Sequence, residues 1–547
     1  MKKFTLIAII ILAAFLRLYK LGSNPPSLYW DEASLGYNAY SILKTAKDEH
    51  GRFLPLTNFA AFGDYKPPGY IYATVPSVAT FGLNEFAVRF PSALFGVLTV
   101  LLSYLLAKKL FENEAIAQLS ALFLAISPWH LQFSRGAFEA NLGLFFSTLG
   151  IYLFVESMTR KPFLIFFSAL SFLIGMYTFT GQRLFVPFIL LILAIQFKNQ
   201  IQKNLKIVIV TLFIAAIFFW PLFVFVTQTI EGKLRFNEVT IFKDLEPIER
   251  STRYRTYDQF EFWANIIHNR RFLYGREYLM HYFDSFNPSF LFIRGDANPR
   301  LSIQDVGELY LVDLLLIPAG IYFLIKTKHQ YRFLILGWLL VSPLGPATAR
   351  ETPHALRMIH ILPTFQILAA FGVVSLYQWV KSTKPNTRHA FFLTAIALAT
   401  AGLLTFNFLF YLHMYYLHWP KNYSGEWQYG YKQAVEAIKP LYNNVDYVVV
   451  AKSLGRPYIY FLLYNRFDPA KYQKSAQVAR DEFYFLDVHG FDKFRFADNV
   501  NEVKVQGRIV YVTTPDNTPE GGVLITTIKR LDGQEIFKIW KVVRGQS

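Results

Sequence analysis

The sequence contains no cysteine. This absence excludes disulfide bonds, thiolate catalysis and cysteine-bound metal ions. Signatures of nucleotide binding and of serine hydrolases are missing as well: the chain has no P-loop, no dinucleotide glycine fingerprint and no G-x-S-x-G elbow. The sequence therefore argues against a machine driven by nucleotide hydrolysis.

Charged residues are also scarce. They make up 17% of the 547 residues, against 53% hydrophobic and 18% aromatic residues, and the mean hydropathy is +0.27. Apolar runs of about 18 or more residues, long enough to span a hydrocarbon core, recur along most of the chain. This composition predicts a polytopic α-helical membrane protein. We interpret the net charge of +17 as a topological signal that also favours anionic lipid headgroups, and not as a footprint of nucleic acid.

Eleven apolar segments are predicted to span the membrane. The first runs to Leu18; Arg17, Tyr19 and Lys20 stand at its end in place of a small-residue cleavage site, so we predict a retained span and not a signal peptide. The other segments are Phe86–Ala107, Ala115–Trp129, Leu142–Val155, Phe163–Tyr177, Leu184–Phe197, Ile207–Val226, Leu309–Ile325, Phe333–Leu344, Ile359–Val380 and Phe391–His413.

The distribution of basic residues supports these spans, which would place successive loops on alternate sides of the membrane. Clusters mark every second loop, at Lys2-Lys3, Lys108-Lys109, Arg160-Lys161, Lys198 to Lys206, Lys326 to Arg332 and from Lys381 onward. The positive-inside rule then places the N-terminus in the cytoplasm. Both long loops, about residues 20–85 and 227–305, and the C-terminus lie outside. We predict a multi-pass protein of the plasma (inner) membrane.

The composition changes after Pro420. Trp427–Lys439 is predicted as an amphipathic helix, Val445–Ala451 and Arg508–Thr513 as strands, and Pro457–Tyr464 as a helix between them. Gly521–Val543 predicts a terminal hairpin. We therefore expect a transmembrane catalytic domain over residues 1–419. A soluble extracytoplasmic α/β domain over residues 420–547 should follow, large enough for its own core.

The first outer loop carries two adjacent carboxylates, Asp31 and Glu32. Transfer of a group to a hydroxyl or amine needs a carboxylate that accepts or orients the acceptor proton. The alternative is that Asp31 caps a helix that begins at Glu32, because aspartate is a favoured N-cap. The two interpretations are compatible, since a capped helix would hold the carboxylate still.

The same loop ends in Tyr65-Lys66-Pro67-Pro68. The prolines fix the backbone and force Lys66 into an extended conformation. A rigidly held ammonium at the membrane surface suits a phosphate leaving group, whose charge grows in the reaction. The alternative is a surface lysine in a proline turn that contacts lipid headgroups.

Further candidates lie in the shorter outer loops. Arg135 and Glu139 are four residues apart and would share one face if they begin the fourth span. Arg135 would then bind phosphate and Glu139 would bind sugar hydroxyls, or the two would pair with each other as an interfacial salt bridge. His354 and Arg357 could bind phosphate together or belong to a basic rim near headgroups.

Two more arginines are weaker candidates. Arg183 lies in another outer loop, and Arg300 belongs to a turn-rich stretch of the second long loop that could cover the site. His268 and His281 in the same loop match no strong metal spacing, so no metal ligand is assigned. Ionisable residues avoid the span centres, where transporters place theirs, which favours chemistry at the interface.

At this point the sequence resembles a known family. Asp31-Glu32 after the first span, Tyr65-Lys66-Pro67-Pro68 at the end of the first outer loop and Arg135 with Glu139 before the fourth span occur in a characteristic order. With Asn298-Pro299-Arg300 and Trp427 to Lys432, they are similar to the GT-C class of membrane glycosyltransferases. The group concerned contains the protein O-mannosyltransferases and the lipid A aminoarabinose transferase.

The resemblance implies a GT-C fold and a polyprenyl- or dolichyl-phosphate sugar as donor, with inversion at the anomeric carbon. It implies Asp31 as the base or acceptor-orienting carboxylate, with Glu32 beside it, and Lys66 as a contact of the donor phosphate. Glu139 would be the second acidic residue, and Arg135 and Arg357 further phosphate ligands. Tyr65, counted with the substrate-binding residues, replaces an acidic residue typical of the aminoarabinose transferases, with Asp64 one position earlier. A divalent metal therefore stays open.

The sequence predicts an integral-membrane glycosyltransferase. It would move sugar from a polyprenyl-phosphate donor to a lipid, glycan or protein acceptor on the extracytoplasmic face, with no nucleic-acid partner. Two alternatives stay open: a transporter or flippase of lipid-linked sugar, and a non-catalytic assembly factor.

Overall fold

A computed structural model of the chain describes residues 2–382, 387–453, 455–480 and 486–544. These residues pack into two compact units. The first unit comprises Met1–Leu16, Phe95–Phe133 and Glu139–Tyr411, and the second comprises Arg17–Leu94, Ser134–Phe138 and Leu412–Ser547. The second unit therefore combines the first outer loop with the C-terminal region. The predicted division at residue 420 stays a prediction about domains.

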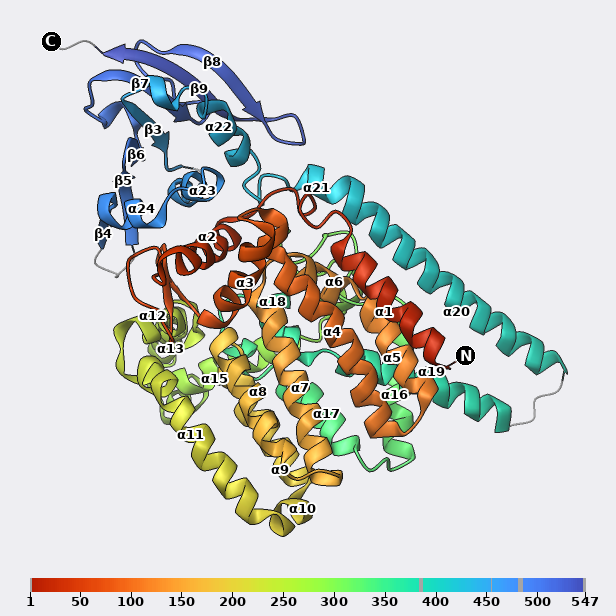
Figure 1. Ribbon diagram of the computed structural model, residues 1–547. Coiled ribbons are helices and arrows are strands. Elements are labelled where there is room, and N and C mark those ends of the chain that lie inside the picture. The colour runs from red at the N-terminus through yellow and green to blue at the C-terminus, as the bar shows by residue number, and fades with distance from the viewer. Residues whose placement is uncertain (1, 383–386, 454, 481–485, 545–547) are drawn as a thin grey trace. The chain divides into compact units, whose positions relative to one another are not determined.

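Helices make up the first unit, and several continue into the second (Figure 1). They are α1 (Lys2–Leu18), α4 (Glu85–Phe111), α5 (Glu114–Ile126), α6 (Pro128–Arg135), α7 (Glu139–Thr159), α8 (Leu164–Thr178), α9 (Gln182–Gln196), α10 (Lys198–Lys203), α11 (Leu205–Gln228), α12 (Ile230–Val239), α13 (Glu246–Tyr257), α14 (Phe262–Ile267), α15 (Arg270–Asp284), α16 (Asp313–Lys326), α17 (Arg332–Val341), α18 (Ala355–Met358), α19 (Thr364–Ser382) and α20 (Thr387–His413).

Close packing within this unit depends on small residues. A Cβ added at Gly320 of α16 would lie 2.0 Å from the backbone oxygen of Leu368 in α19, and one added at Gly372 would lie 2.4 Å from that of Leu316. The two helices approach closely because these positions carry no side chain, as is common between membrane helices.

Four helices in the described part of the chain are long and apolar enough to cross a bilayer: Glu85–Phe111, Glu139–Thr159, Leu205–Gln228 and Leu393–Asn422. The bent pair Ala355–Ile361 and Thr364–Ser382 makes a fifth candidate. Shorter apolar helices lie at other predicted spans: Phe4–Leu18, Glu114–Ile126, Leu164–Thr178, Gln182–Gln196 and Arg332–Thr348. The fold is thus that of a helical membrane protein, and the count of eleven spans stays a prediction.

The second unit carries the predicted C-terminal sheet. Its elements are α2 (Trp30–Thr45), β1 (Phe59–Ala61), β2 (Asp64–Lys66), α3 (Pro68–Phe81), α21 (Trp419–Asn422), α22 (Tyr431–Ile438), β3 (Tyr447–Ala451), α23 (Pro457–Tyr464), α24 (Pro469–Ser475), β4 (Gln477–Arg480), β5 (Leu486–Phe491), β6 (Phe494–Ala497), β7 (Gly507–Thr513), β8 (Val523–Lys529) and β9 (Glu535–Arg544). The strand order is β4-β5-β6-β3-β7-β9-β8, and β3 runs parallel to both β6 and β7.

The sequence predicted much of this sheet. The predicted helix Pro457–Tyr464 has the bounds of α23, and the terminal hairpin is β8 and β9. The helix predicted over Trp427–Lys439 was too long, because Gly430 takes a positive φ of 121° and α22 begins only after it. The three strands β4, β5 and β6 were not predicted.

Helix α2 packs against the sheet's own helices (Figure 1). The Tyr37 hydroxyl donates a hydrogen bond to the Phe467 backbone oxygen at 3.0 Å. A Cβ at Gly36 would lie 2.5 Å from Val88 and 3.4 Å from Leu463 of α23. The absence of a side chain at Gly36 thus lets α2 approach Val88 of α4 closely, while Leu463 of the C-terminal region lies at an ordinary contact distance.

Candidate functional site

Lys66 lies between two carboxylates. Its Nζ is 2.9 Å from Asp31 Oδ1 and 2.8 Å from Asp64 Oδ2. The Lys66 side chain is 11% exposed, and those of Asp31 and Asp64 are 24% and 25% exposed. The cluster is therefore sheltered and still open to a reactant, and we call these three residues the ion cluster.

Local backbone structure positions the ion cluster. Asp64 and Lys66 are two residues apart in strand β2, so their side chains project from the same face. The strand is held by pairing with β1 and by Pro67 and Pro68, the N-cap and first residue of α3. Lys66 is thus extended, as predicted.

Asp31 is the second residue of helix α2, where its charge interacts favourably with the helix dipole. The suggestion that Asp31 caps the helix was wrong. The helix begins at Trp30, and Tyr29 occupies the N-cap. The carboxylate of Asp31 is consequently free of a capping role and turns to Lys66 instead.

Glu32 faces the opposite way and is completely buried. Its Oε1 accepts hydrogen bonds from Arg89 Nε at 2.9 Å and from the Ala137 backbone N–H at 2.7 Å. Its Oε2 accepts from Arg89 Nη2 at 2.9 Å and from the Tyr29 backbone N–H at 3.3 Å. An enclosed carboxylate with these partners positions the start of α2, and the catalytic role predicted for Glu32 stays a prediction.

Arg89 completes this anchor. Its Nη1 also donates to the backbone oxygens of Leu21 and Pro25, at 3.2 and 2.8 Å. The guanidinium lies 5.6 Å from the ring centre of Trp427, which packs edge-on against Tyr29. The Trp427 motif recognised in the sequence thus braces the helix that carries Asp31.

Arg135 makes comparable hydrogen bonds at the end of α6, and its predicted role in binding phosphate stays a prediction. Its Nε donates to the Tyr415 hydroxyl at 3.0 Å, and its Nη2 donates to the backbone oxygens of Tyr19 and Asn24 at 2.8 and 2.9 Å. The shared helix face predicted for Arg135 and Glu139 was wrong. Helix α6 ends at Arg135 and α7 begins at Glu139, because the chain turns at the intervening Gly136.

The remaining candidates apart from Tyr65 belong to the first unit. Arg357 Nη1 donates to the Glu351 backbone oxygen at 2.9 Å, and His354 Nδ1 lies 3.8 Å from Asp296 Oδ2. Arg300 donates its backbone N–H to Asn298 at 3.0 Å. Arg183 donates from Nε to the Met176 backbone oxygen at 3.2 Å. In the second unit, Tyr65 of β2 pairs with Ala60 of β1. Their predicted roles in substrate binding stay predictions.

Sequence reasoning did not assign Asp64 to the site. The signal was present, because an extended strand before Pro67 puts residues 64 and 66 on one face. Asp31 and Asp64 could be considered as metal ligands, yet Lys66 already lies between them, so this arrangement does not fit a divalent ion. Within the described ranges, no group of three histidine, aspartate or glutamate side chains is close enough to hold a metal.

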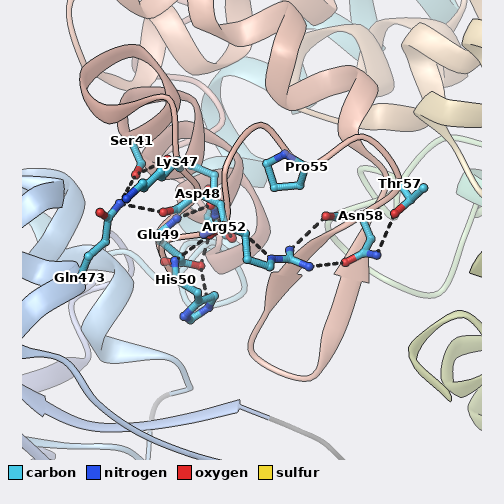
Figure 2. A network of polar contacts seen from close by, with 12 residues as sticks. Ser41, Lys47, Asp48, Glu49, His50, Arg52, Pro55, Thr57, Asn58 and Gln473 are labelled. Atoms are coloured by element: carbon cyan, nitrogen blue, oxygen red, sulfur yellow. Dashed lines mark hydrogen bonds and ion pairs between the residues drawn. The ribbon is translucent and has the colours of Figure 1, made fainter. Parts of the chain in front are cut away.

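A second polar network stiffens the loop between α2 and β1 (Figure 2). Arg52 donates from Nε to Asp48 Oδ2 at 2.7 Å and from Nη1 to Asn58 Oδ1 at 2.9 Å. Gln473 of α24 donates to the Asp48 backbone oxygen at 2.9 Å. This network ties the first outer loop to the sheet region that follows α23.

Glu49 and His50 are buried beside that network. Glu49 Oε1 accepts from Asn38 Nδ2 at 3.2 Å and lies 3.6 Å from His50 Nε2. Burial raises the pKa of Glu49 to about 8 and lowers the pKa of His50 to about 4. Both groups are therefore held near their neutral forms at neutral pH.

These shifts predict that stability falls between pH 6.5 and 8. Folded Glu49 keeps a proton that its unfolded form, with a pKa of 4.5, has lost, so its contribution declines as pH rises. The opposite contribution of His50 is lost as pH falls from 6.5 towards 4, and is constant above that window. We expect the free energy of unfolding to drop by about 2 kcal/mol over this range. Denaturant unfolding of the parent and Glu49→Gln at both pH values measures it; an equal drop in Glu49→Gln would contradict it.

Known proteins match this chain over part of its length. Residues 7–230 match the family model "Dolichyl-phosphate-mannose-protein mannosyltransferase". The chain is 34% identical over 172 residues to an uncharacterized protein of Aquifex aeolicus, covering 31% of this chain and 32% of that protein. It is 28% identical over 225 residues to the putative mannosyltransferase YkcB of Bacillus subtilis, covering 40% and 30%. The chain thus matches about a third of the length of these curated relatives.

Solved structures share the fold over a longer stretch. ArnT from Cupriavidus metallidurans in the apo state matches with a TM-score of 0.56 and 13% identity, covering 99% of this chain and 98% of that chain. ArnT bound to undecaprenyl phosphate matches with a TM-score of 0.53, 12% identity and the same coverage. The oligosaccharyltransferase AglB from Archaeoglobus fulgidus, with an inhibitory peptide and a dolichol-phosphate, matches with a TM-score of 0.54 and 13% identity, covering 85% and 63%. The resemblance to GT-C glycosyltransferases is confirmed at the level of the fold.

Proposed function

We propose that this protein is a membrane glycosyltransferase that takes a sugar from a polyprenyl-phosphate donor. The observation that carries the proposal is the ion cluster, in which Lys66 joins Asp31 and Asp64 on a helix start and a proline-braced strand. Proteins of the same fold have been solved with undecaprenyl phosphate and with a dolichol-phosphate, which supports this donor class. The acceptor would be a lipid, glycan or protein on the extracytoplasmic face of the plasma (inner) membrane. The eleven predicted spans would hold the protein in this membrane.

The reaction assigns one task to each polar group. The acceptor hydroxyl or amine attacks the anomeric carbon and gives its proton to the Asp31 carboxylate. The bond from the anomeric carbon to the phosphate oxygen breaks, and its electron pair leaves with the polyprenyl phosphate. Attack opposite to the leaving group inverts the anomeric centre.

Lys66 couples the two halves of this step. Protonation removes the charge of Asp31 and weakens its hold on the ammonium 2.9 Å away. Lys66 can then stabilise the charge that develops on the departing phosphate. Asp64 keeps Lys66 in place throughout, since their ion pair of 2.8 Å does not involve the base. The other predicted site residues keep their proposed roles. Glu32 and Glu139 are proposed as further acidic residues, and the proposed substrate contacts are Tyr65, Arg135, Arg183, Arg300, His354 and Arg357.

The test uses purified protein in lipid with a panel of radiolabelled polyprenyl-phosphate sugars. Release of free polyprenyl phosphate is followed for the parent, Asp31→Asn and Lys66→Ala. Release by the parent that both variants lose supports sugar transfer at the ion cluster. Equal release by all three would move the site elsewhere, and no release with any donor and acceptor would argue against the proposal.

Lys66→Ala is expected to lower the rate of donor cleavage by about 10²- to 10³-fold, because the leaving phosphate loses its fixed positive charge. Lys66→Arg should recover part of the rate, since the charge is kept with a different geometry. Lys541→Ala, which removes an exposed lysine from β9, is the matched control and should be neutral. Donor cleavage by Lys66→Ala within twofold of the parent would contradict this role.

A further inference from the structure

The C-terminal sheet holds a pocket of about 230 Å³ that the proposed reaction does not use. Its lining includes Lys452, Gly455, Arg456, Tyr458, Asp487 and Asp498. We call it the sheet pocket. Lys452 and Asp498 directly follow the parallel strands β3 and β6, so the pocket lies at the carboxyl ends of these strands.

This position in the sheet is a favoured one for ligands. From β3 the chain first builds the strands on one side, β4 to β6, and then the strands on the other side, β7 to β9. The strand order therefore reverses at β3, and open sheets bind ligands outside the carboxyl ends of strands at such a point. Helix α23 begins at Pro457, which belongs to the pocket lining.

The charges of the lining are balanced. Lys452 and Arg456 supply two cations, and Asp487 and Asp498 supply two carboxylates. Lys452 Nζ is 2.6 Å from Asp487 Oδ2, so one cation is already neutralised within the pocket. Balanced charge selects neither an anion nor a cation. Carboxylates and guanidinium groups together offer the acceptors and donors that neighbouring hydroxyl groups require.

The walls of the sheet pocket reach both elements that hold the ion cluster. Gly455 has a φ of 112°, and a Cβ added there would lie 3.0 Å from the ring of Trp30, the residue before Asp31. Arg456 stacks on the ring of Phe62 with a separation of 5.3 Å, and the Phe62 backbone oxygen accepts from the Leu486 N–H at 2.9 Å. Phe62 forms the turn into β2, which carries Lys66.

We propose that the sheet pocket binds one neutral sugar unit of the acceptor, so that the acceptor of the proposed transfer is a saccharide. This inference rests on the proposed glycosyl transfer. A volume slightly below that of most small-molecule sites suits a single sugar ring, and the mixed polar lining suits its hydroxyl groups. Gly455 lies close to Trp30 and Arg456 contacts Phe62, so the lining of the sheet pocket adjoins helix α2, which carries Asp31, and the turn into strand β2, which carries Lys66.

The experiment measures binding of neutral methyl glycosides to the full-length protein in lipid nanodiscs by calorimetry. Asp487→Asn and Asp498→Asn each replace one carboxylate of the lining with an amide, and each should weaken binding about tenfold. Asp516→Asn is the matched control for both, since Asp516 is exposed and lies outside the pocket lining, and it should bind like the parent.

Binding is read independently of transfer, so the two proposals fail separately. Glycoside binding that the pocket variants lose supports the sheet pocket even if no donor is cleaved. The proposed sugar site would be overturned if the protein cleaves the donor but binds no glycoside, or if the pocket variants bind the glycoside as well as the parent does. Inorganic phosphate that binds with the same sensitivity to the variants would overturn it in favour of an anion site. A glycolipid with the same headgroup is compared with the free glycoside: tighter binding identifies a lipid-anchored saccharide, and equal affinity a free one.

Discussion

Asp31→Asn is expected to lower kcat for sugar transfer by about 10²- to 10⁴-fold, the range that a positioned general base contributes. Asparagine keeps the shape of the side chain and cannot accept the acceptor proton. The Lys66–Asp64 ion pair of 2.8 Å does not depend on Asp31, so the strand and its ammonium should stay in place. The donor KM should therefore change much less than kcat. Single-turnover cleavage of a labelled donor in the presence of acceptor measures the effect.

The control for this variant is Asp516→Asn, an isosteric change in the loop after β7, which should cleave the donor at the parent rate. Raising the pH distinguishes the role of Asp31 further. If Asp31 is the base, a more basic medium should recover part of the lost rate, because hydroxide can take the acceptor proton instead; if Asp31 only orients the acceptor, the rate should not recover. Asp31→Asn with a kcat within threefold of the parent would contradict the assignment of Asp31 as the base.

Arg89→Met should destabilise the protein by about 3–5 kcal/mol, because breaking a buried ion pair leaves an uncompensated charge. Both side chains of the Arg89–Glu32 pair are 0% exposed, so solvent offers Glu32 no replacement for the lost guanidinium. The same change also removes the bonds from Arg89 to the backbone of Leu21 and Pro25. Unfolding of the protein in detergent, followed by tryptophan fluorescence, measures the loss.

The double variant Glu32→Gln with Arg89→Met tests whether the loss comes from the stranded charge. It should be more stable than Arg89→Met alone, since no unpaired carboxylate stays buried. Arg508→Met is the control at an exposed pair, where Arg508 and Asp446 are 53% and 44% exposed, and it should leave the midpoint almost unchanged. A midpoint for Arg89→Met as high as that of the control would contradict the anchoring role.

The sequence predicted two members of the ion cluster, Asp31 and Lys66, but not the third, Asp64. Pro67 and Pro68 restrict the backbone locally, so the extended conformation of Lys66 could be deduced without any tertiary contact. The meeting of Lys66 with Asp31 depended on the resemblance, because local rules do not bring together residues 35 positions apart. The same extended strand puts residues 64 and 66 on one face, so Asp64 was deducible as a neighbour of Lys66 but was not predicted.

Glu32 shows why adjacent residues can have different roles. Successive residues of a helix point about 100° apart, so Asp31 and Glu32 cannot face the same environment. Which of them faces the interior is decided by Arg89, 57 residues further along the chain. The pattern of residues around Asp31 contains no signal for that partner, so the burial of Glu32 could not be predicted from the sequence.

The prediction for Arg135 failed for a local reason. A spacing of four residues implies a shared face only within one continuous helix. Glycine at position 136 lets the chain leave the helix there, and α7 starts anew at Glu139. Strands β4 to β6 escaped prediction because they are short and two of them, β4 and β5, alternate or expose their side chains without a continuous apolar run.

The most direct test of the central claim uses a donor with one label in the sugar and another in the phosphate, reconstituted with the protein in sealed vesicles. The account predicts that the labels separate: the sugar label enters the acceptor, and the phosphate label stays in the membrane as polyprenyl phosphate. Asp31→Asn should leave the two labels joined. If the parent instead moves the intact donor across the bilayer with both labels together, the protein is a transporter and the assignment of the ion cluster to glycosyl transfer is wrong.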